Sequence, residues 1–201
     1  PYGSDQCGAY ALTAALAAEE ALPVSKDTTI TYSSNSSTLK SADTFADTAG
    51  KIYVLTGILN PSRASGSGSE TVTKNGYNSP AAMASVATDL GKSVKINVTA
   101  AGYSGLSAMY PNEKTRCESV VTSTNVNTAA TYTDPAMDEV HLICVMNSSG
   151  GLHWINRGSD KKYYDSGDGT LGNDWGKPET NKSLPNKSSY TFSGLWLVII
   201  K

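Results

Sequence analysis

Cys7 and His153 are the two residues whose types could form a nucleophile and a general base. Alanines and leucines that recur at helical spacing predict a helix from about Asp5 to Leu22, so Cys7 falls in its first turn. A thiol there lies near the positive end of the helix dipole, which favours the thiolate. Gly8 leaves one side of the sulfur uncovered. Cys7 is therefore a candidate nucleophile, and a buried structural cysteine is the alternative.

His153 begins a predicted strand directly after a glycine-containing turn, and a hairpin follows it. Equal offsets from a turn centred on Ser159 place Asp165 directly opposite, on the same face and about 5 Å away. An aspartate that holds the imidazole of a histidine facing a cysteine completes a triad of the cysteine-protease type. A different turn register would bring Asp168 opposite instead. A plain hairpin with a polar pair is the structural alternative.

The other cysteines and the other histidine are expected to be structural. Cys144 lies within an apolar run and is predicted to be a core residue, whereas Cys117 lies in a polar segment and is predicted to be exposed. A disulfide between these two would leave Cys7 as the odd free thiol, which suits a nucleophile. His141 opens a buried strand and is interpreted as structural, although it is the rival base if His153 has another role.

Composition excludes several classes of function. Charged residues make up 17% of the 201 residues and the net charge is −2, so nucleic-acid binding is disfavoured. No apolar run reaches the roughly 18 residues of a membrane span. Two histidines and no CxxC pair predict no metal site, and no cofactor is expected. A surface rich in Ser, Thr and Asn, and a start at Pro1 without a methionine, favour a processed, secreted or extracellular protein, which we expect to be a monomer.

The elements that must position these residues run helices first and strands last. The predicted helices are Asp5 to Leu22 with Ser4 or Asp5 as N-cap and Pro23 as stop, Asp43 to Leu59, and Ala81 to Leu90 with Ser79 as N-cap and Pro80 at its first position. The predicted strands are Thr29–Tyr32, Ser93–Thr99, His141–Asn147, His153–Arg157, Lys162–Asp165 and Trp196–Lys201. Residues 64–77 read as a Gly/Ser loop, and residues 100–135 show no clear period. This order predicts an α+β fold in a single domain, helical over about 1–91 and β-rich over about 92–201.

Three motifs in this order resemble those of papain-like bacterial cysteine peptidases, most closely the double-glycine (bacteriocin-leader) peptidases. They are Asp5-Gln6-Cys7-Gly8-Ala9-Tyr10-Ala11-Leu12, His153-Trp154-Ile155 and Tyr164-Asp165-Ser166-Gly167. The resemblance implies a papain-like fold in which the helix of the nucleophile packs on a C-terminal antiparallel sheet. It implies that the Cys7 thiolate attacks an acyl carbon, that His153 acts as base and then acid, and that Asp165 orients the imidazole.

The sequence departs from the motifs of these peptidases at two points. Their oxyanion glutamine stands several residues before the cysteine, about where this chain begins, and the nearby candidate is Gln6, directly before Cys7. Another alignment, on the plant-type papain motif, places the nucleophile at Tyr10 and would make the protein an inactive relative.

The sequence thus predicts a cysteine-dependent hydrolase that cleaves a peptide or amide bond of a peptide or protein substrate through a thioester. We expect a secreted bacterial protease or effector, with Trp154 and Trp175 as candidates for lining the substrate groove. A deamidase or transglutaminase-type toxin would use the same three residues. A non-catalytic papain-like binding module is the alternative of a different class.

Overall fold

The computed structural model describes residues 5–59, 71–72, 76–172, 175–176, 178–179 and 182–201. Its helices are α1 (Cys7–Ala18), α2 (Phe45–Thr56), α4 (Pro80–Asp89), α5 (Ala100–Met109), α6 (Glu113–Val121) and the short 3₁₀ helix η1 (Ser123–Asn125). Its strands are β1 (Thr28–Tyr32), β2 (Asn35–Leu39), β3 (Gly57–Leu59), β4 (Thr71–Val72), β5 (Tyr77–Asn78), β6 (Ser93–Val98), β7 (Val126–Asn127), β8 (Glu139–Asn147), β9 (Leu152–Arg157), β10 (Tyr163–Asp165), β11 (Thr170–Gly172), β12 (Ser183–Leu184) and β13 (Lys187–Ile200).

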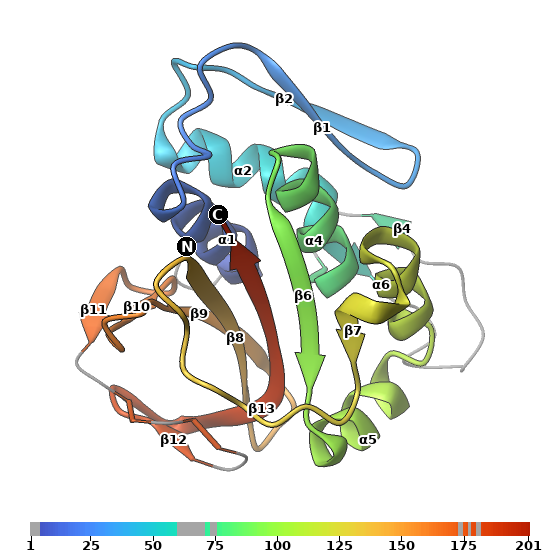
Figure 1. Ribbon diagram of the computed structural model, residues 1–201, viewed down its shortest axis with the longest axis vertical. Helices are drawn as coiled ribbons and strands as arrows, with labels where there is room; N and C mark the ends of the chain where they lie inside the picture. Colours follow the sequence, from blue (N-terminus) through green and yellow to red (C-terminus); the bar gives the residue numbers. More distant parts are fainter. Residues whose placement is uncertain (1–4, 60–70, 73–75, 173–174, 177, 180–181) are drawn as a thin grey trace.

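One large sheet organises the described part of the chain. Its strands follow the order β11-β10-β9-β8-β13-β6-β7, and β12 pairs with β13. The pair β6–β7 is parallel and the other described pairs of this sheet are antiparallel. Figure 1 shows α1, α2 and α4 gathered beside the upper part of the sheet, with the β1–β2 hairpin above them. The predicted α+β fold, with helices first and a mostly antiparallel sheet last, is confirmed.

The C-terminal strand β13 joins two parts of the sheet. Its second half pairs with β6 and β8, and its register with β8 shifts between Phe192 and Trp196. Gly194 stands inside this irregularity with φ +90°, a conformation that side-chain-bearing residues rarely adopt. The bulge separates the first part of β13, which pairs with β12, from its last part, which pairs with β6.

The two faces of the sheet bury separate hydrophobic clusters. The larger cluster packs the helices on the sheet and includes Leu12, Leu16, Met83, Leu142, Trp154 and Leu197. The smaller cluster lies on the other face and includes Tyr132, Ile143, Ile155, Trp175, Phe192 and Trp196. The side chains of β9 alternate between these faces, as the pleat of a strand requires. Trp154 belongs to the first cluster and Ile155 to the second. Successive residues of β9 therefore face different sides of the molecule.

The helix predictions hold in position, and their ends are corrected. Helix α1 begins at Cys7, as the candidate nucleophile requires, but its N-cap is Gln6 without a side-chain cap, and it ends at Ala18, before Pro23. Ser4, the other predicted N-cap, lies outside the described residues. Helix α4 begins at Pro80, as predicted, and the Ser79 hydroxyl accepts a hydrogen bond from the backbone N–H of Ala82 at 3.2 Å.

Residues 100–135 contain the main elements that sequence reasoning misses. Helix α5 carries two glycines, which weaken the helical pattern, and helix α6 is mostly polar, with only Cys117 and Val121 buried.

The predicted Trp196–Lys201 strand is the last part of the much longer β13. Most of the predicted Gly/Ser loop 64–77 lies outside the described residues. Among the helices that the structure describes, none is long and apolar enough to span a membrane.

Candidate active site

Helix α1 is held close to strand β9, which places the start of the helix beside the histidine strand. The buried side chain of Asn156 on β9 donates a hydrogen bond from Nδ2 to the carbonyl oxygen of Ala11 at 2.7 Å. Most residues on the buried face of α1 are small, among them Ala11 and Ala15. The partly exposed Cys7 is thereby fixed at the end of the helix that faces the site.

A buried asparagine fixes the backbone on both sides of Cys7. Asn78 donates from Nδ2 to the carbonyl oxygen of Asp5 at 2.7 Å, and its Oδ1 accepts from the Thr56 hydroxyl at 2.8 Å. The same side chain lies against Gly8, where an added Cβ would be 2.4 Å from Cβ of Asn78. The space that Gly8 leaves is therefore filled by Asn78, and only glycine fits there.

His153 lies near the start of β9, buried and hydrogen-bonded on its ring. Its Nε2 is 2.7 Å from Oδ1 of Asp165. Cys7 lies close enough to the imidazole to help raise its pKa, and since Nε2 is taken by Asp165, Nδ1 is the nitrogen left for the sulfur. The ring of Tyr190 from β13 lies tilted against the imidazole, with 5.6 Å between the centroids. The structure therefore brings Cys7, His153 and Asp165 together.

The register expected for the hairpin is wrong by two residues. Asp165 pairs with Ile155, and Tyr163 pairs with Arg157, so Asp165 is the diagonal neighbour of His153. Because a shift of two residues keeps side chains on the same face, the carboxylate still reaches the imidazole. The turn centres one residue later than Ser159, and Lys161 within it adopts φ 64°.

The Asp165 carboxylate is fully buried and accepts hydrogen bonds on both oxygens. Oδ1 accepts from His153 and from the backbone N–H of Gly167 at 2.8 Å, and Oδ2 accepts from Lys187 Nζ at 2.5 Å. Burial alone would raise the pKa of Asp165, but the bonds from His153, Lys187 and Gly167 outweigh burial and hold it well below its usual range. Asp165 is therefore an anion that holds the imidazole in place.

Two opposing influences set the proton affinity of His153. Burial is the largest and lowers its pKa, whereas the hydrogen bond that the imidazole donates to Asp165 and the interaction with Cys7 together outweigh it and raise the pKa to about 9. The imidazole thus stays protonated through neutral pH. A cysteine beside an imidazolium is the arrangement that activates a thiol as a nucleophile.

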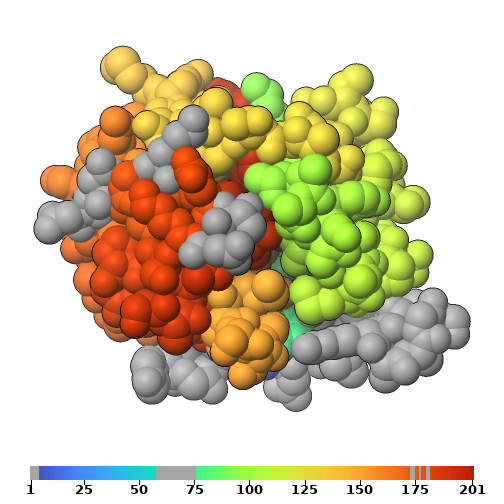
Figure 2. All heavy atoms as spheres, turned by 90° about the horizontal axis from the view of Figure 1, so that it is seen from below, coloured from blue at the N-terminus to red at the C-terminus, as the bar shows by residue number. Residues whose placement is uncertain are grey.

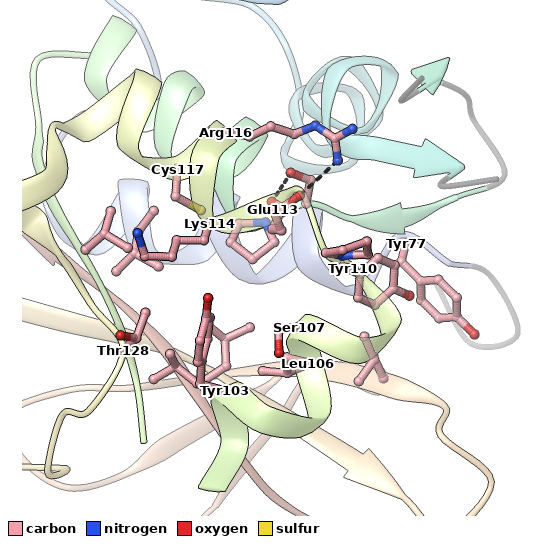
Figure 3. Close-up of a pocket in the computed structure, with 18 of the residues that line it drawn as sticks. Tyr77, Tyr103, Leu106, Ser107, Tyr110, Glu113, Lys114, Arg116, Cys117 and Thr128 are labelled. Carbon is pink, nitrogen blue, oxygen red and sulfur yellow. Dashed lines mark hydrogen bonds and ion pairs between the residues drawn. The ribbon is translucent and has the colours of Figure 1, made fainter. Parts of the chain in front are cut away.

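A mostly apolar pocket of about 850 Å³, its open mouth included, is lined by neighbours of these residues rather than by the residues themselves. Leu152 and Trp154, on either side of His153 in the chain, line it, as does Asn78, which contacts Asp5 and Gly8 on either side of Cys7. Figure 3 shows Tyr103 of α5 pointing between α5 and α6 toward Lys114 and Cys117, with Tyr77 and Tyr110 at one end. In Figure 2, α5 (green) and the orange-red part of the chain lie on opposite sides of the face that is viewed.

A comparison with known protein families matches the whole chain to one of them. The family model is described as "Invasion plasmid antigen J, cysteine protease" and matches residues 1–201. The chain belongs to this family. Neither the curated proteins nor the solved structures contain a match to the chain. The resemblance to bacterial cysteine peptidases is therefore supported at the level of this cysteine protease family, and the closer likeness to double-glycine peptidases stays a prediction.

The two alternative candidates, Asp168 and His141, do not contact the imidazole of His153. Asp168 is 40% exposed and pairs with Lys187 at 3.4 Å, so it does not hold the imidazole. His141 lies four residues from the partner of His153 along β8, roughly 13 Å away, and its Nδ1 is 3.1 Å from the Tyr132 hydroxyl. Burial, the largest influence, lowers the pKa of His141 to about 4. The rival base is a structural histidine of the second cluster.

The predictions for the remaining cysteines and tryptophans are partly corrected. Cys117 is 3% exposed, so the expectation that it is exposed is wrong, and Cys144 is a core residue, as expected. All three cysteines are free. Trp154 is buried between the first cluster and the pocket, whereas Trp175 belongs to the second cluster, where its Nε1 donates to the Ser183 carbonyl at 2.7 Å. Trp175 therefore does not line this pocket.

Sequence reasoning misses four residues that hold this protease's site together. Asn78 and Thr56 position the segment that leads into Cys7 at the start of α1. Gly167 and Lys187 hold Asp165. Gly167 belongs to the Tyr-Asp-Ser-Gly motif, which was a usable signal. The other three carry no local pattern, because their partners lie far away in the sequence.

Proposed function

We propose that this protein is a papain-like cysteine protease that cleaves a peptide or amide bond with Cys7 as nucleophile, His153 as acid and base, and Asp165 as the residue that orients the imidazole. The observation that carries the proposal is that one imidazole is hydrogen-bonded to Asp165 and also interacts with Cys7, which helps to raise its pKa. Membership of a cysteine protease family favours this chemistry over a purely structural cluster.

The proposed reaction begins with attack of the Cys7 thiolate on the carbonyl carbon of the substrate. The tetrahedral intermediate collapses when the His153 imidazolium gives its proton to the leaving amine, so the C–N bond breaks and a thioester forms. The neutral imidazole then takes a proton from water, which attacks the thioester and releases the carboxylic acid and Cys7. The Asp165 carboxylate stabilises the imidazolium and keeps Nδ1 directed at the sulfur.

The oxyanion of this intermediate needs hydrogen-bond donors near Cys7. Cys7 is the first residue of α1, and the first backbone N–H groups of a helix have no partner within it, so the Cys7 N–H is one candidate. The Gln6 side chain is the second candidate, because it directly precedes Cys7 and does not cap the helix. Replacing Gln6 by alanine would then lower kcat by about 100-fold, and replacing it by glutamate would not restore the rate.

The pocket indicates the chemistry of the substrate. Its lining is mainly aliphatic and aromatic, and it includes Leu152 and Trp154, the chain neighbours of His153, and Asn78, which contacts Gly8 next to Cys7. We propose that it takes an apolar group of the substrate that lies near the scissile bond. The partner is a peptide or protein, and we further propose that the protease is a secreted or host-delivered monomer that folds as one domain.

The experiment is an identification of new N-termini after the purified protein is incubated with a native proteome. We expect new termini with apolar residues enriched near the cleaved bonds, and none with Cys7→Ala as matched control. Termini that appear equally with Cys7→Ala would overturn the assignment of the nucleophile. Conversion of substrate glutamines to glutamate without chain cleavage would instead favour the deamidase alternative.

A further inference from the structure

Lys187, the first residue of β13, contacts the carboxylate of Asp165, one of the proposed catalytic residues. Its Nζ is 2.5 Å from Oδ2 of Asp165 and 3.4 Å from Oδ2 of Asp168, and its side chain is 21% exposed. Burial lowers the pKa of Lys187, but its bonds to the two carboxylates outweigh burial and raise it, so the ammonium group stays charged. A permanent cation is thus attached to the carboxylate that holds the imidazole.

His153 and Lys187 share one buried anion. Asp165 binds the imidazole through Oδ1 and the ammonium group through Oδ2. Asn186 adds a weak contact to Oδ2 at 3.4 Å, and Gly167 N–H supports Oδ1. Because Oδ1 has this second donor, the carboxylate keeps its orientation toward the imidazole even without the lysine. The main effect of Lys187 on His153 is therefore one of charge.

Gly167 shows how closely the three groups meet. A Cβ at Gly167 would lie 3.0 Å from Lys187 Nζ, 3.1 Å from Asp165 Oδ1 and 3.1 Å from His153 Cε1. The ammonium group therefore lies within about 6 Å of the imidazole. A cation at that distance disfavours the protonated imidazole and weakens the hold of Asp165 on its proton.

The other titratable groups around the imidazole are Cys7 from α1, Tyr190 from β13 and Asp168 from the turn after β10. The β8 partner of His153 is Val145, which is uncharged. Cys7 and Asp165 both favour the imidazolium, and Asp168 is half-exposed and paired with the lysine. Among these groups Lys187 is the one cation, so its charge adds to burial in opposing the protonation of His153.

We propose that Lys187 is a positioning residue that acts through Asp165 and limits how tightly His153 holds its proton. The role deepens the proposed function, because a general acid that must give a proton to the leaving amine works best when it does not hold that proton too firmly. The lysine thereby sets the upper end of the pH range in which the imidazolium can act as an acid.

The test is an NMR titration of the two histidine rings in the intact protein and in Lys187→Met. We expect the midpoint of His153 to move upward by about 0.5 to 2 pH units in Lys187→Met, and to stay in place in Lys187→Arg. Lys26→Met, which makes the same change in net charge at an exposed position, should leave it unchanged. Lys187→Gln should shift it in the same direction as methionine and serves if Lys187→Met does not fold.

A midpoint that stays in place or falls in both neutral variants would overturn the role of Lys187, because a merely structural residue lowers stability without moving this titration. The titration needs no substrate, so it is separate from the test of protease activity. A raised midpoint without any cleavage activity would keep the role of Lys187 and overturn the proposed function. Cleavage activity with an unmoved midpoint would support the proposed function and overturn the role of Lys187.

Discussion

Nε2 of His153 and Oδ1 of Asp165 lie 2.7 Å apart, although the two residues are not paired across their hairpin. Asp165 reaches the imidazole diagonally, over the position that Gly167 leaves open. The contact occupies Nε2 of the imidazole and leaves Nδ1 for Cys7, which also helps to raise the pKa of His153. Consequences of this arrangement, and of the contacts around Cys7, can be measured.

Iodoacetamide should label Cys7 faster than the other two cysteines, which are buried. The reason is that Cys7 is partly exposed and lies beside the imidazolium of His153, an arrangement that activates a thiol as a nucleophile. Peptide mapping after short labelling at pH 6 measures the three rates separately. His153→Ala should slow the labelling of Cys7 alone, and equal rates for all three cysteines would contradict the arrangement.

The chain has two histidines, so their ring titrations can be told apart by NMR. We expect one midpoint near pH 9 for His153 and one near pH 4 for His141. The first is raised by Asp165 and Cys7 against burial, and the second is lowered by burial. A midpoint near pH 6.5 for either ring would contradict the structure, and His141→Gln identifies the lower one.

The stability of the folded protein should depend on pH through the protonation of His153. The pKa of His153 is raised on folding, so its contribution is fully present below about pH 6.5 and is lost as pH rises through about 9. The melting temperature should therefore fall between pH 7 and pH 10. His153→Ala should lack this part of the fall, and an identical fall in both proteins would assign it to other groups.

Asp165→Asn should lower kcat/KM by about 10- to 100-fold, because a neutral amide cannot stabilise the imidazolium. The midpoint of His153 should fall with it, since the carboxylate is a principal cause of its elevation. Asp168→Asn is the matched control and should change kcat/KM by less than about fivefold, because this carboxylate is half-exposed. Equal losses in both variants would count against Asp165 as the orienting residue.

Gly8→Ala should destabilise the protein by about 1–3 kcal/mol and lower activity, because the new methyl group would overlap the Asn78 side chain. Gly50→Ala in α2 is the matched control, since nothing lies within 4 Å of the added carbon. That change should raise stability by about 1 kcal/mol, as alanine favours helices. Thermal unfolding measures both, and a Gly8→Ala protein as stable as the parent would show that Asn78 does not hold this loop.

Local signals in the sequence were enough for several features. The alanine-rich run predicted a helix with Cys7 in its first turn, and Ser79 followed by Pro80 predicted the start of α4. Short runs with aromatic residues on either side of a turn predicted the strands that carry His153 and Asp165. These features depend on residues a few positions apart, so caps and periodicity determine them.

The exact contacts of the site depend on residues that are distant in the chain. The hairpin register came out two residues from the expected one, because turn geometry decides it and the face pattern is the same in both registers. Helices α5 and α6, which line the pocket, form against the sheet in spite of weak local patterns.

The sequence by itself thus determined the α+β class, a helix with Cys7 in its first turn and the hairpin that joins His153 to Asp165. Only the tertiary structure decided that Asn156 ties α1 to β9, that Asn78 holds the Cys7 loop and that Lys187 shares the carboxylate of Asp165. Each of these contacts joins segments that meet only when the core is packed. Their energy comes from burial and from pairing of polar groups across that core, which no local pattern encodes.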